Sequence, residues 1–587
     1  MAKFHLVEAI VLIVLAVAFL ALISYGGWDT QAQPLVTSYN TSFWNLNQTY
    51  PPLNLNITPA GSSVFNGVTV SYSDVWFNSN IFNGSTVVIH GTLMQPFGSN
   101  LPAVLLLPNF GNTSKDLVPL GTAIASNGYA VLAIDLPGSG NSTGMIPTPE
   151  SLTNLSNGPS SSYYYQSVIA ASRAITALDN VSSVNPSETA VLGVSQGGVT
   201  AVQLASVDGR VKTVVSALSG GYLDENVLRG SLLGFNLTKG VSVNSQTFKD
   251  LVSYFDANAY AQQLSVPALF ITGTNDQYFL LNQVNATFGN VQSQKAILLE
   301  PNQGNTLPND WNTTILTWLD HFLMGTGATL PTPNVTGVQY INFYTALNVS
   351  TSQLSFGASS ANYTGALFYR PSVPGATWSE VSLSGSSNST GISAGNAVIP
   401  LPPLPTNFEY FVALTSNGTI VSTSTLYQTQ ATPSYFVIIL LFVVLVGAVL
   451  AFQWWGDIAA YASYHKRSTF LLIVGVIVWA IAAFSLTQPW ISTPGNAMLN
   501  VMQTWDRFPS LSSVYVILGL TLLALVGYAV RLWIGGILLI LTGAVVFFAT
   551  LNAFAPYGAV SFAWGAYLFA VCIAVSLLIP AILKVTE

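Results

Sequence analysis

One serine in this chain lies in a sequence pattern typical of a catalytic nucleophile. Ser195 is the centre of Gly193-Val-Ser-Gln-Gly197, which follows a short apolar run and precedes a helix-like run at residues 199–205. Glycines on both sides of a serine permit a sharp, strained turn between a strand and a helix, and that turn presents the hydroxyl at the end of the strand. The positive end of the following helix lies beside the hydroxyl. The pattern therefore predicts a serine nucleophile.

The elements that must position this serine alternate along the chain. From Val68 to about Thr326, short β-rich apolar runs alternate with helical patterns. This alternation predicts an α/β fold, in which helices flank a parallel sheet. An insertion at residues 219–264 follows the strand-like run at residues 211–218.

These features resemble the α/β-hydrolase superfamily, and within it the dienelactone-hydrolase, acetyl-esterase and prolyl-peptidase-like members. Three further motifs carry the resemblance, namely Leu105-Leu-Leu-Pro-Asn-Phe-Gly-Asn112, Ala130-Val-Leu-Ala-Ile-Asp-Leu-Pro-Gly-Ser-Gly-Asn-Ser142 and Val266-Pro-Ala-Leu-Phe-Ile-Thr-Gly-Thr-Asn-Asp276. The resemblance covers less than half of the chain. It implies a doubly wound sheet and a serine hydrolase of peptide or ester bonds.

The resemblance also implies roles for particular residues. Ser195 corresponds to the nucleophile and Asp276 to the acid of a catalytic triad, in the expected chain order. The backbone amides of Phe110 and Gln196 correspond to the donors that stabilise a developing oxyanion. The insertion at 219–264 lies where this superfamily carries a lid. Its aromatic and leucine side chains could line a substrate pocket or form a small core of the lid itself.

The third member of the triad is missing. Residues 296–305 align with the strand and turn that normally end in Gly-His, and Asn305 occupies the histidine position. Asparagine cannot take a proton from a serine hydroxyl, so the usual base is absent. We expect His90 to be a packed strand residue and His321 to be a helix-face residue. Asp276, Glu300 or Asp310 could assist Ser195 directly.

Two hypotheses about function follow from the missing histidine. In the first, the chain is a serine hydrolase that works without imidazole, as suits acidic surroundings where imidazole is protonated. In the second, it is a catalytically silent, glycosylated surface protein that uses the hydrolase scaffold and a following β-sandwich for binding or assembly. Loss of a triad member typically lowers the rate by several powers of ten.

The remaining segments complete a five-part organisation. Residues 1–27 read as an uncleaved transmembrane signal anchor, with a cleaved signal peptide as the alternative. Residues 28–66 read as a linker or extra strands, and 67–328 as the hydrolase-like domain. Alternating apolar and polar residues with Pro- and Gly-rich turns at 329–432 resemble an immunoglobulin or fibronectin type III sandwich. Residues 433–587 read as five membrane helices.

Long apolar runs predict six membrane-spanning helices. They lie at residues 9–25, 435–452, 470–486, 514–530, 532–551 and 559–582. The Lys and Arg residues near their ends fall mostly on one side, which predicts cytoplasmic termini and an extracellular region at residues 28–432.

The predicted extracellular region is rich in acceptor motifs for N-linked glycans, which are Asn-x-Ser/Thr triplets. They occur at Asn40, Asn47, Asn56, Asn83, Asn112, Asn141, Asn154, Asn180, Asn236, Asn285, Asn312, Asn334, Asn348, Asn362, Asn388 and Asn417. The expected partners are therefore the membrane, N-linked glycans, and other membrane or surface-layer proteins.

Composition excludes several classes of function. Only 6% of the residues are charged, with a net charge of −7, so a basic surface for nucleic acid is not expected. The low charge resembles that of surface proteins from acid-living archaea. A single cysteine, Cys572, excludes disulfides within the chain. Motifs for a cofactor or a metal ion are absent from the sequence.

Overall fold

The computed structural model of the chain describes most of residues 35–431 and several segments nearer the C-terminus. Within 35–431, the description leaves out residues 37, 47, 308–310, 328, 342–345, 352–353, 356–362, 373–375, 385–386, 389–390, 393–394, 401–405 and 417. Beyond it, the described segments are 466–486, 489–492, 498–500, 532–554, 561–562 and 564–585, together with residues 520 and 524.

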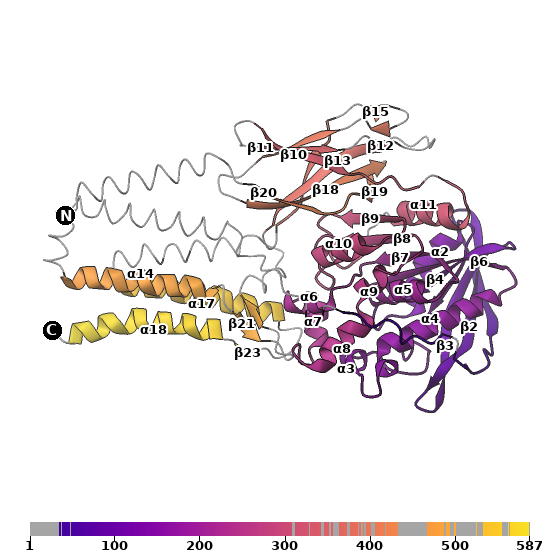
Figure 1. Ribbon diagram of the computed structural model, residues 1–587, viewed down its shortest axis with the longest axis horizontal. Coiled ribbons are helices and arrows are strands. Elements are labelled where there is room, and N and C mark those ends of the chain that lie inside the picture. Colours follow the sequence, from indigo (N-terminus) through magenta and orange to yellow (C-terminus); the bar gives the residue numbers. More distant parts are fainter. Residues whose placement is uncertain are drawn as a thin grey trace.

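A long mixed sheet is the centre of the molecule (Figure 1). Its first nine strands are β1 (Asn56–Phe65), β2 (Val68–Phe82), β3 (Ser85–Pro96), β4 (Leu101–Leu107), β5 (Ala130–Ile134), β6 (Val184–Val194), β7 (Val211–Ala217), β8 (Ala268–Gly273) and β9 (Lys295–Glu300). Their spatial order is β1-β2-β3-β5-β4-β6-β7-β8-β9. Pairing is antiparallel from β1 to β5 and parallel from β5 to β9. The carboxyl ends of β6, β8 and β9 therefore meet at one edge.

Helices cover both faces of this sheet. They are η1 (Ser114–Leu117), α2 (Val118–Ala125), α3 (Pro149–Thr153), η2 (Pro159–Ser161), α4 (Tyr163–Asp179), α5 (Gln196–Val207), α6 (Leu223–Leu228), α7 (Leu232–Leu237), α8 (Gln246–Phe255), α9 (Ala257–Ala261), α10 (Leu281–Asn290) and α11 (Trp311–Leu323). Apolar side chains of α4, α5 and α10 belong to the core on one face, and those of α2 and α11 to the core on the other. We call residues 56–323 the α/β domain.

The apolar runs of the parallel strands explain this layering. In β4, Leu105 and Leu107 pack into one core, while Val104 and Leu106 pack into the other. A strand that is buried on both faces reads as a continuous apolar run, because successive side chains point to opposite sides.

A second β-rich unit, residues 335–431, follows and is called the β-domain here. Its strands are β10 (Val335–Ile341), β11 (Ala346–Thr351), β12 (Leu354–Ser355), β13 (Tyr363–Pro371), β14 (Ser379–Ser382), β15 (Ser387–Asn388), β16 (Gly391–Ile392), β17 (Asn396–Pro400), β18 (Thr406–Ser416), β19 (Thr419–Thr423) and β20 (Tyr427–Ala431). β10, β11 and β17 form one sheet, and side chains of β11 and β17 share an apolar cluster with those of β13 and β18. The immunoglobulin- or fibronectin-like topology stays a prediction.

The two units share the long sheet. Thr423 of β19 pairs with Ile297 of β9, and its hydroxyl accepts a hydrogen bond from the Leu299 amide at 3.1 Å. Sheet order therefore continues from β9 through β19, β18 and β13 to β14.

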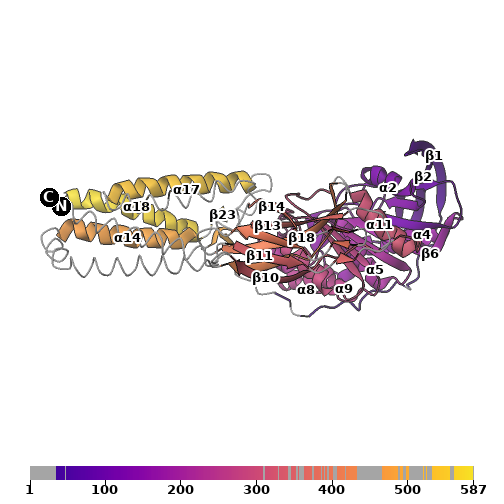
Figure 2. The same cartoon turned by 90° about the horizontal axis from the view of Figure 1, so that it is seen from above.

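The C-terminal segments form helices that lie side by side. They are α14 (Lys466–Leu486), α17 (Leu532–Phe554) and α18 (Trp564–Val585), with the short strands β21 (Pro489–Ser492), β22 (Met498–Asn500) and β23 (Ser561–Phe562). Both views place the three helices together at the end of the molecule opposite the α/β domain (Figures 1 and 2).

The prediction of six membrane-spanning helices is wrong. Among the described residues, no helix has both the length and the apolar character that crossing a membrane requires. Apolar runs also occur in helices that bury their surface against one another, and a run alone does not separate the two cases. Here α14 and α17 both pack along α18, and Ala482, Val546 and Cys572 are buried.

The predicted localisation, with residues 28–432 extracellular and both termini cytoplasmic, depends on those six helices and is wrong as well. Residues 9–25 and 435–452, and nearly all of 514–530, lie outside the described residues.

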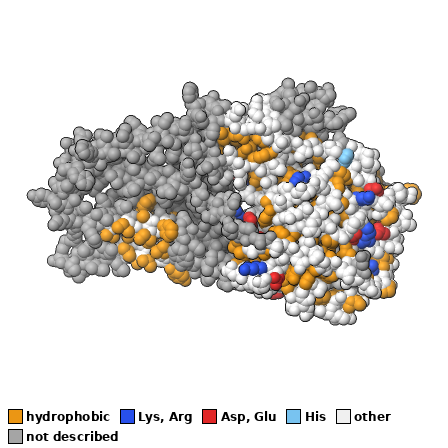
Figure 3. All heavy atoms as spheres, viewed as in Figure 1, with side chains coloured by type: hydrophobic (Ala, Val, Ile, Leu, Met, Phe, Trp, Pro, Cys, Tyr) orange, Lys and Arg blue, Asp and Glu red, His pale blue; other side chains and the backbone are white. Residues whose placement is uncertain are grey.

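One face of the α/β domain is mostly uncharged. In the view of Figure 3, a few charged side chains are scattered among hydrophobic and other uncharged groups. This matches the low charged fraction of the sequence, 6%. Within the segment predicted as a linker or extra strands, residues 56–65 form β1, and the Trp44 indole donates to the Tyr260 hydroxyl of α9 at 2.8 Å.

Candidate active site

Ser195 lies at a strained turn between β6 and α5. Its backbone has φ 55° and ψ −116°, a conformation that residues other than glycine rarely adopt. Its amide donates to the Ala217 carbonyl at 2.8 Å, and its carbonyl accepts from the amides of Gly198 and Val199. Its side chain is only 6% exposed. Strand β7, through Ala217, and the first turn of α5 thus hold this turn from both sides.

The flanking glycines are sterically required at this turn. A Cβ on Gly193 would overlap the backbone of Gly197. A Cβ on Gly197 would collide with the carbonyl oxygens of Leu107 and Pro108, which end the neighbouring strand β4. The spacing of Gly-x-Ser-x-Gly therefore reflects close backbone contacts that a side chain would prevent.

The two predicted oxyanion donors differ in this structure. The Gln196 amide opens helix α5, where the first turn leaves its N–H groups without carbonyl partners, and it donates no hydrogen bond within the described part of the chain. The Phe110 amide donates to the side-chain oxygen of Asn109 at 2.7 Å. The Gln196 amide is therefore free to donate to an oxyanion. The Phe110 amide becomes free only when the Asn109 side chain rotates.

Asp276 and Asn305 are hydrogen-bonded to each other. The Asn305 Nδ2 donates to Oδ2 of Asp276 at 2.7 Å, while Oδ1 accepts from the amides of Tyr278 and Phe279 at 2.7 and 3.2 Å. Burial raises the pKa of Asp276 to about 6, and these three hydrogen bonds only partly oppose the rise. Asn305 thus makes the orienting hydrogen bond that a triad histidine makes to its acid, but it supplies no base.

Close backbone contacts bring the two loops together. Gly273 ends β8, and a Cβ there would collide with the carbonyl oxygens of Gln303 and Gly304. The Asn275 amide donates to the Gln303 carbonyl at 2.8 Å. Asn305 can reach Asp276 because this approach leaves no gap between the loops. Of the other acids considered, Glu300 ends β9, and Asp310 lies outside the described residues.

Neither histidine of the α/β domain stands in for the missing base. His90 lies in β3, and its Nδ1 is 2.8 Å from Oδ2 of Asp135. His321 lies on α11 with its Nδ1 3.3 Å from the Gly327 carbonyl. Both are engaged by groups other than Ser195, as expected for a strand residue and a helix-face residue.

The His90–Asp135 pair has a structural role that the sequence did not reveal. Asp135 also accepts from the amides of Ser114 and Asn141, at 2.6 and 3.0 Å, which fixes the glycine-rich turn after β5. The hydrogen bond to Asp135 raises the pKa of His90, and burial opposes it. Burial pushes the pKa of Asp135 upward, but the hydrogen bonds from His90 and the two amides hold it below its ordinary value.

The expected lid consists of α6 to α9, and its apolar side chains form a core. Phe235 and Phe255 are buried, and Phe255 stacks on Tyr164 of α4 with ring centroids 5.4 Å apart. Of the two readings of these aromatic residues, the structure favours the core. The fully buried Asp256 carboxylate accepts from the amides of Tyr222, Leu223 and Asn258. Burial raises the pKa of Asp256 to about 7.

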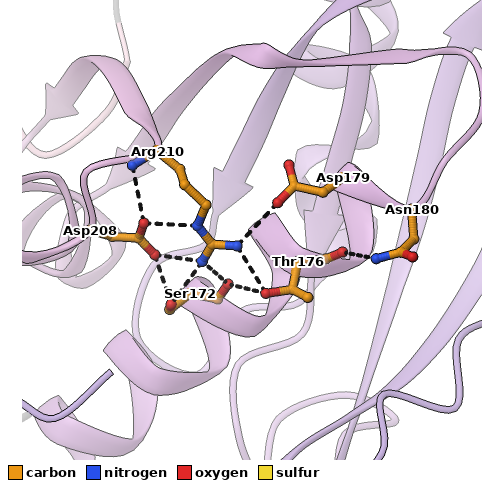
Figure 4. A network of polar contacts seen from close by, with 6 residues as sticks. All are labelled: Ser172, Thr176, Asp179, Asn180, Asp208 and Arg210. Carbon is orange, nitrogen blue, oxygen red and sulfur yellow. Dashed lines mark hydrogen bonds and ion pairs between the residues drawn. The ribbon is translucent and has the colours of Figure 1, made fainter. Parts of the chain in front are cut away.

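Two surface pockets lie away from this site. One, of about 640 Å³, is lined by residues of α3 and α8. The other, of about 340 Å³, is lined by Arg173 and by the network around Arg210 (Figure 4). In that network Arg210 binds Asp208 at 2.6 Å and Asp179 at 3.1 Å, which ties α4 to the end of α5. Ser195 and Asp276 line neither pocket.

The predicted glycan acceptors mostly lie on the surface. Asn40, Asn56, Asn83, Asn112, Asn141, Asn180, Asn312 and Asn334 are exposed, and Asn154, Asn236, Asn285 and Asn348 are half-buried. Asn47, Asn362 and Asn417, and the side chain of Asn388, lie outside the described residues. Asn285 accepts from the Leu426 amide at 2.9 Å and donates to its carbonyl at 3.4 Å, so a sugar at this position would break a contact between the two domains.

Comparison with known proteins bears on the α/β domain. Residues 102–231, which include β4 to β7 and Ser195, match the family described as alpha/beta hydrolase fold. The chain has the α/β-hydrolase fold. Residues 237–355 match a second family, described as PhoPQ-activated pathogenicity-related protein.

One curated relative is an esterase. The acetyl esterase Axe7A of Xylanibacter ruminicola is 26% identical to this chain over 247 residues, which cover 39% of this chain and 55% of the relative. The chain thus spans about half the length of that protein.

Solved structures similar to the chain include two acetyl xylan esterases. The enzyme from Paenibacillus sp. R4 is 21% identical, with a TM-score of 0.42, and the match covers 47% of this chain and 91% of that one. Acetyl xylan esterase 1 from Thermoanaerobacterium sp. JW/SL YS485 is 19% identical, with a TM-score of 0.39, covering 46% and 87%.

Proposed function

We propose that this chain hydrolyses carboxylic esters, with Ser195 as the nucleophile and acetyl esters as the substrate class. The observation that carries the proposal is the backbone of Ser195, with φ 55° and ψ −116° next to the free amide of Gln196. Such a conformation costs about 1–3 kcal/mol and is typical of functional sites. The acetyl specificity rests on the curated acetyl esterase to which the chain is similar.

The proposed reaction proceeds in two steps. The Ser195 Oγ attacks the ester carbonyl carbon, and the oxyanion that forms accepts a hydrogen bond from the Gln196 amide. The alcohol leaves with the proton of the serine hydroxyl, and an acyl-serine remains. Water then attacks the acyl-serine, which releases the carboxylic acid and restores the hydroxyl.

Asp276 is the proposed base. Asn305 cannot accept the serine proton, but the Asp276 carboxylate can take it through a water molecule. Its pKa of about 6 makes it a stronger base than an ordinary carboxylate.

The missing imidazole also favours esters over peptides. A histidine gives its proton to the leaving amine during peptide cleavage, and an amine does not leave readily without that proton. An alcohol is a better leaving group and depends less on protonation. We therefore assign ester bonds to this site.

Labelling with a fluorophosphonate probe tests the proposal. The intact chain is treated between pH 4 and 9, and hydrolysis of p-nitrophenyl acetate is followed in parallel. We expect labelling and hydrolysis that vanish in Ser195→Ala. Both rates should rise as the pH increases through about 6, because the ionised form of Asp276 accepts the proton. A folded protein that neither labels nor hydrolyses esters at any pH would refute the proposal and favour a silent scaffold.

A further inference from the structure

The β-domain reaches the loop that carries Asp276. Arg370, on β13, donates from Nη1 to the side-chain oxygen of Asn275 at 3.0 Å. Asn275 directly precedes Asp276 in the chain. Arg370 is itself held by Glu409 of β18, whose Oε2 is 2.8 Å from both Nε and Nη2. Glu409 therefore fixes the guanidinium within the β-domain, in the position from which it contacts Asn275 of the α/β domain.

A second contact holds the loop that carries Asn305. The Trp378 amide donates to Oδ1 of Asn302 at 2.8 Å, and the Asn302 Nδ2 donates to the Trp378 carbonyl at 3.4 Å. Asn302 has φ 61°, so the chain turns sharply just before Asn305. Arg370 lies over the Trp378 ring at 4.6 Å from its centroid. The two contacts thus belong to one unit of the β-domain.

Apolar packing makes this unit continuous with the α/β domain. Phe368, Trp378 and Phe411 are buried in the same apolar cluster as the core that α4 and α5 cover. The Trp378 and Phe411 rings meet edge to face with centroids 4.9 Å apart. Aromatic pairs of this kind contribute about 0.5–1.5 kcal/mol beyond the area that they bury.

We infer that Arg370 and Trp378 of the β-domain are positioning residues for the candidate active site, because they hold the loops that present Asp276 and Asn305. This inference rests on the proposed ester hydrolysis. We call the contacts of Arg370 with Asn275 and of Trp378 with Asn302 the clamp, because together they hold the two loops that carry Asp276 and Asn305. Displacement of a catalytic group by about 1 Å lowers a rate on the order of 100-fold. Loss of these contacts should accordingly lower kcat and leave KM nearly unchanged, because Arg370 and Trp378 act through Asn275 and Asn302 and are assigned no role in binding substrate.

Variants of the Arg370–Asn275 pair test the clamp. Arg370→Ala, Asn275→Ala and the double variant are compared in the full chain for kcat and KM with p-nitrophenyl acetate. Asn275→Ala keeps Glu409 paired, so it stays informative if Arg370→Ala folds poorly. We expect each single variant to lower kcat about 10- to 100-fold, and the double variant to lower it no further. Arg370→Lys should not rescue kcat, because an ammonium group cannot bind Glu409 and Asn275 in the same fork.

Arg173→Ala is the matched control. Arg173 also lies over an aromatic ring, that of Tyr50 at 4.9 Å, and also donates to neighbouring carbonyls, but it is on α4 and lines a pocket without Ser195. The Arg173→Ala substitution should lower the free energy of unfolding and leave kcat unchanged. Equal losses of kcat in Arg173→Ala and Arg370→Ala, or additive losses in the double variant, would overturn the inference.

Hydrogen exchange separates the inference from the proposed function. The amides of Tyr278 and Phe279 donate to Asp276, so their exchange reports the order of this loop whether or not the chain is an enzyme. We expect exchange at these amides to be at least about 10-fold faster in Asn275→Ala and unchanged in Arg173→Ala. Unchanged exchange in Asn275→Ala would refute the clamp. Faster exchange in a chain that does not label with fluorophosphonate would refute only the proposed function.

Discussion

At the scale of single residues, the hydrogen bond between Asn305 and Asp276 defines the candidate site. The amide of Asn305 donates to the Asp276 carboxylate at 2.7 Å, which is the contact that orients imidazole in a triad. An amide and an imidazole differ in basicity but can donate the same hydrogen bond. The site therefore keeps a hydrogen bond to the carboxylate of Asp276 and lacks the imidazole that accepts the serine proton in a complete triad.

Replacement of Asn305 by histidine should restore the imidazole base of a complete triad. We expect Asn305→His to increase kcat/KM for p-nitrophenyl acetate by about 10²–10⁴-fold near pH 8, the usual contribution of a general base. Asn305 is half-buried, so a larger ring has room on its exposed side. The matched control is Asn305→His combined with Ser195→Ala, which should show no gain. A folded Asn305→His chain without increased activity would mean that position 305 does not face Ser195.

At the scale of elements, the turn between β6 and α5 depends on the absence of side chains. Strand β4 approaches so closely that the carbonyl oxygens of Leu107 and Pro108 occupy the space of a Cβ on Gly197. Phe110 lies in the loop after β4. Sterics at one glycine thus control the turn that presents Ser195.

Gly197→Ala should accordingly destabilise the fold and the site together. We expect a loss of about 1–3 kcal/mol in the free energy of unfolding, as for other forced overpacking, and loss of fluorophosphonate labelling. Gly209→Ala is the control, since a Cβ there meets no atom within 4 Å, and it should change stability by less than about 0.5 kcal/mol. Urea denaturation measures the free energy of unfolding of both variants. Equal stability of the two variants would contradict the steric account.

At the scale of the whole molecule, charged residues are sparse and several of the carboxyl groups among them are buried. The chain has 22 acidic and 15 basic residues among 587. Burial raises the pKa of Asp256 to about 7 and of Asp276 to about 6, and it also raises the pKa of Asp224. Each of these groups binds a proton more tightly in the folded chain than in the unfolded one.

The fold should therefore be more stable in mild acid than at neutral pH. A carboxyl whose pKa is raised by folding contributes stability when protonated, and this contribution is lost as the pH rises through the folded pKa. The raised pKa of His90 acts in the same direction. We expect the free energy of unfolding to fall by on the order of 2–4 kcal/mol between pH 5 and pH 8.

Thermal unfolding as a function of pH measures this effect. Asp256→Asn cannot ionise and should flatten the dependence between pH 6 and pH 8. Wild-type stability that increases toward pH 8 would show that these carboxyl groups do not govern the pH response.

Local sequence determined the parts of this protein that depend on neighbours along the chain. The Gly-x-Ser-x-Gly turn and the alternation of strands and helices both follow from short-range sterics and periodicity. The place of Asn305 beside Asp276 could also be predicted, because β8 and β9 are consecutive parallel strands whose carboxyl ends meet at one edge. Apolar runs alone misled the prediction of membrane helices, since they do not reveal what a helix packs against.

Only the tertiary structure decided the contacts between distant segments. Arg370 lies 95 residues from Asn275, and Trp378 lies 76 residues from Asn302, so no local pattern relates them. The occupied Phe110 amide depends on the rotamer of Asn109, and the pKa values of Asp256 and Asp276 depend on burial. Burial and long-range hydrogen bonds come from how the folded segments meet, which the order of residues does not state directly.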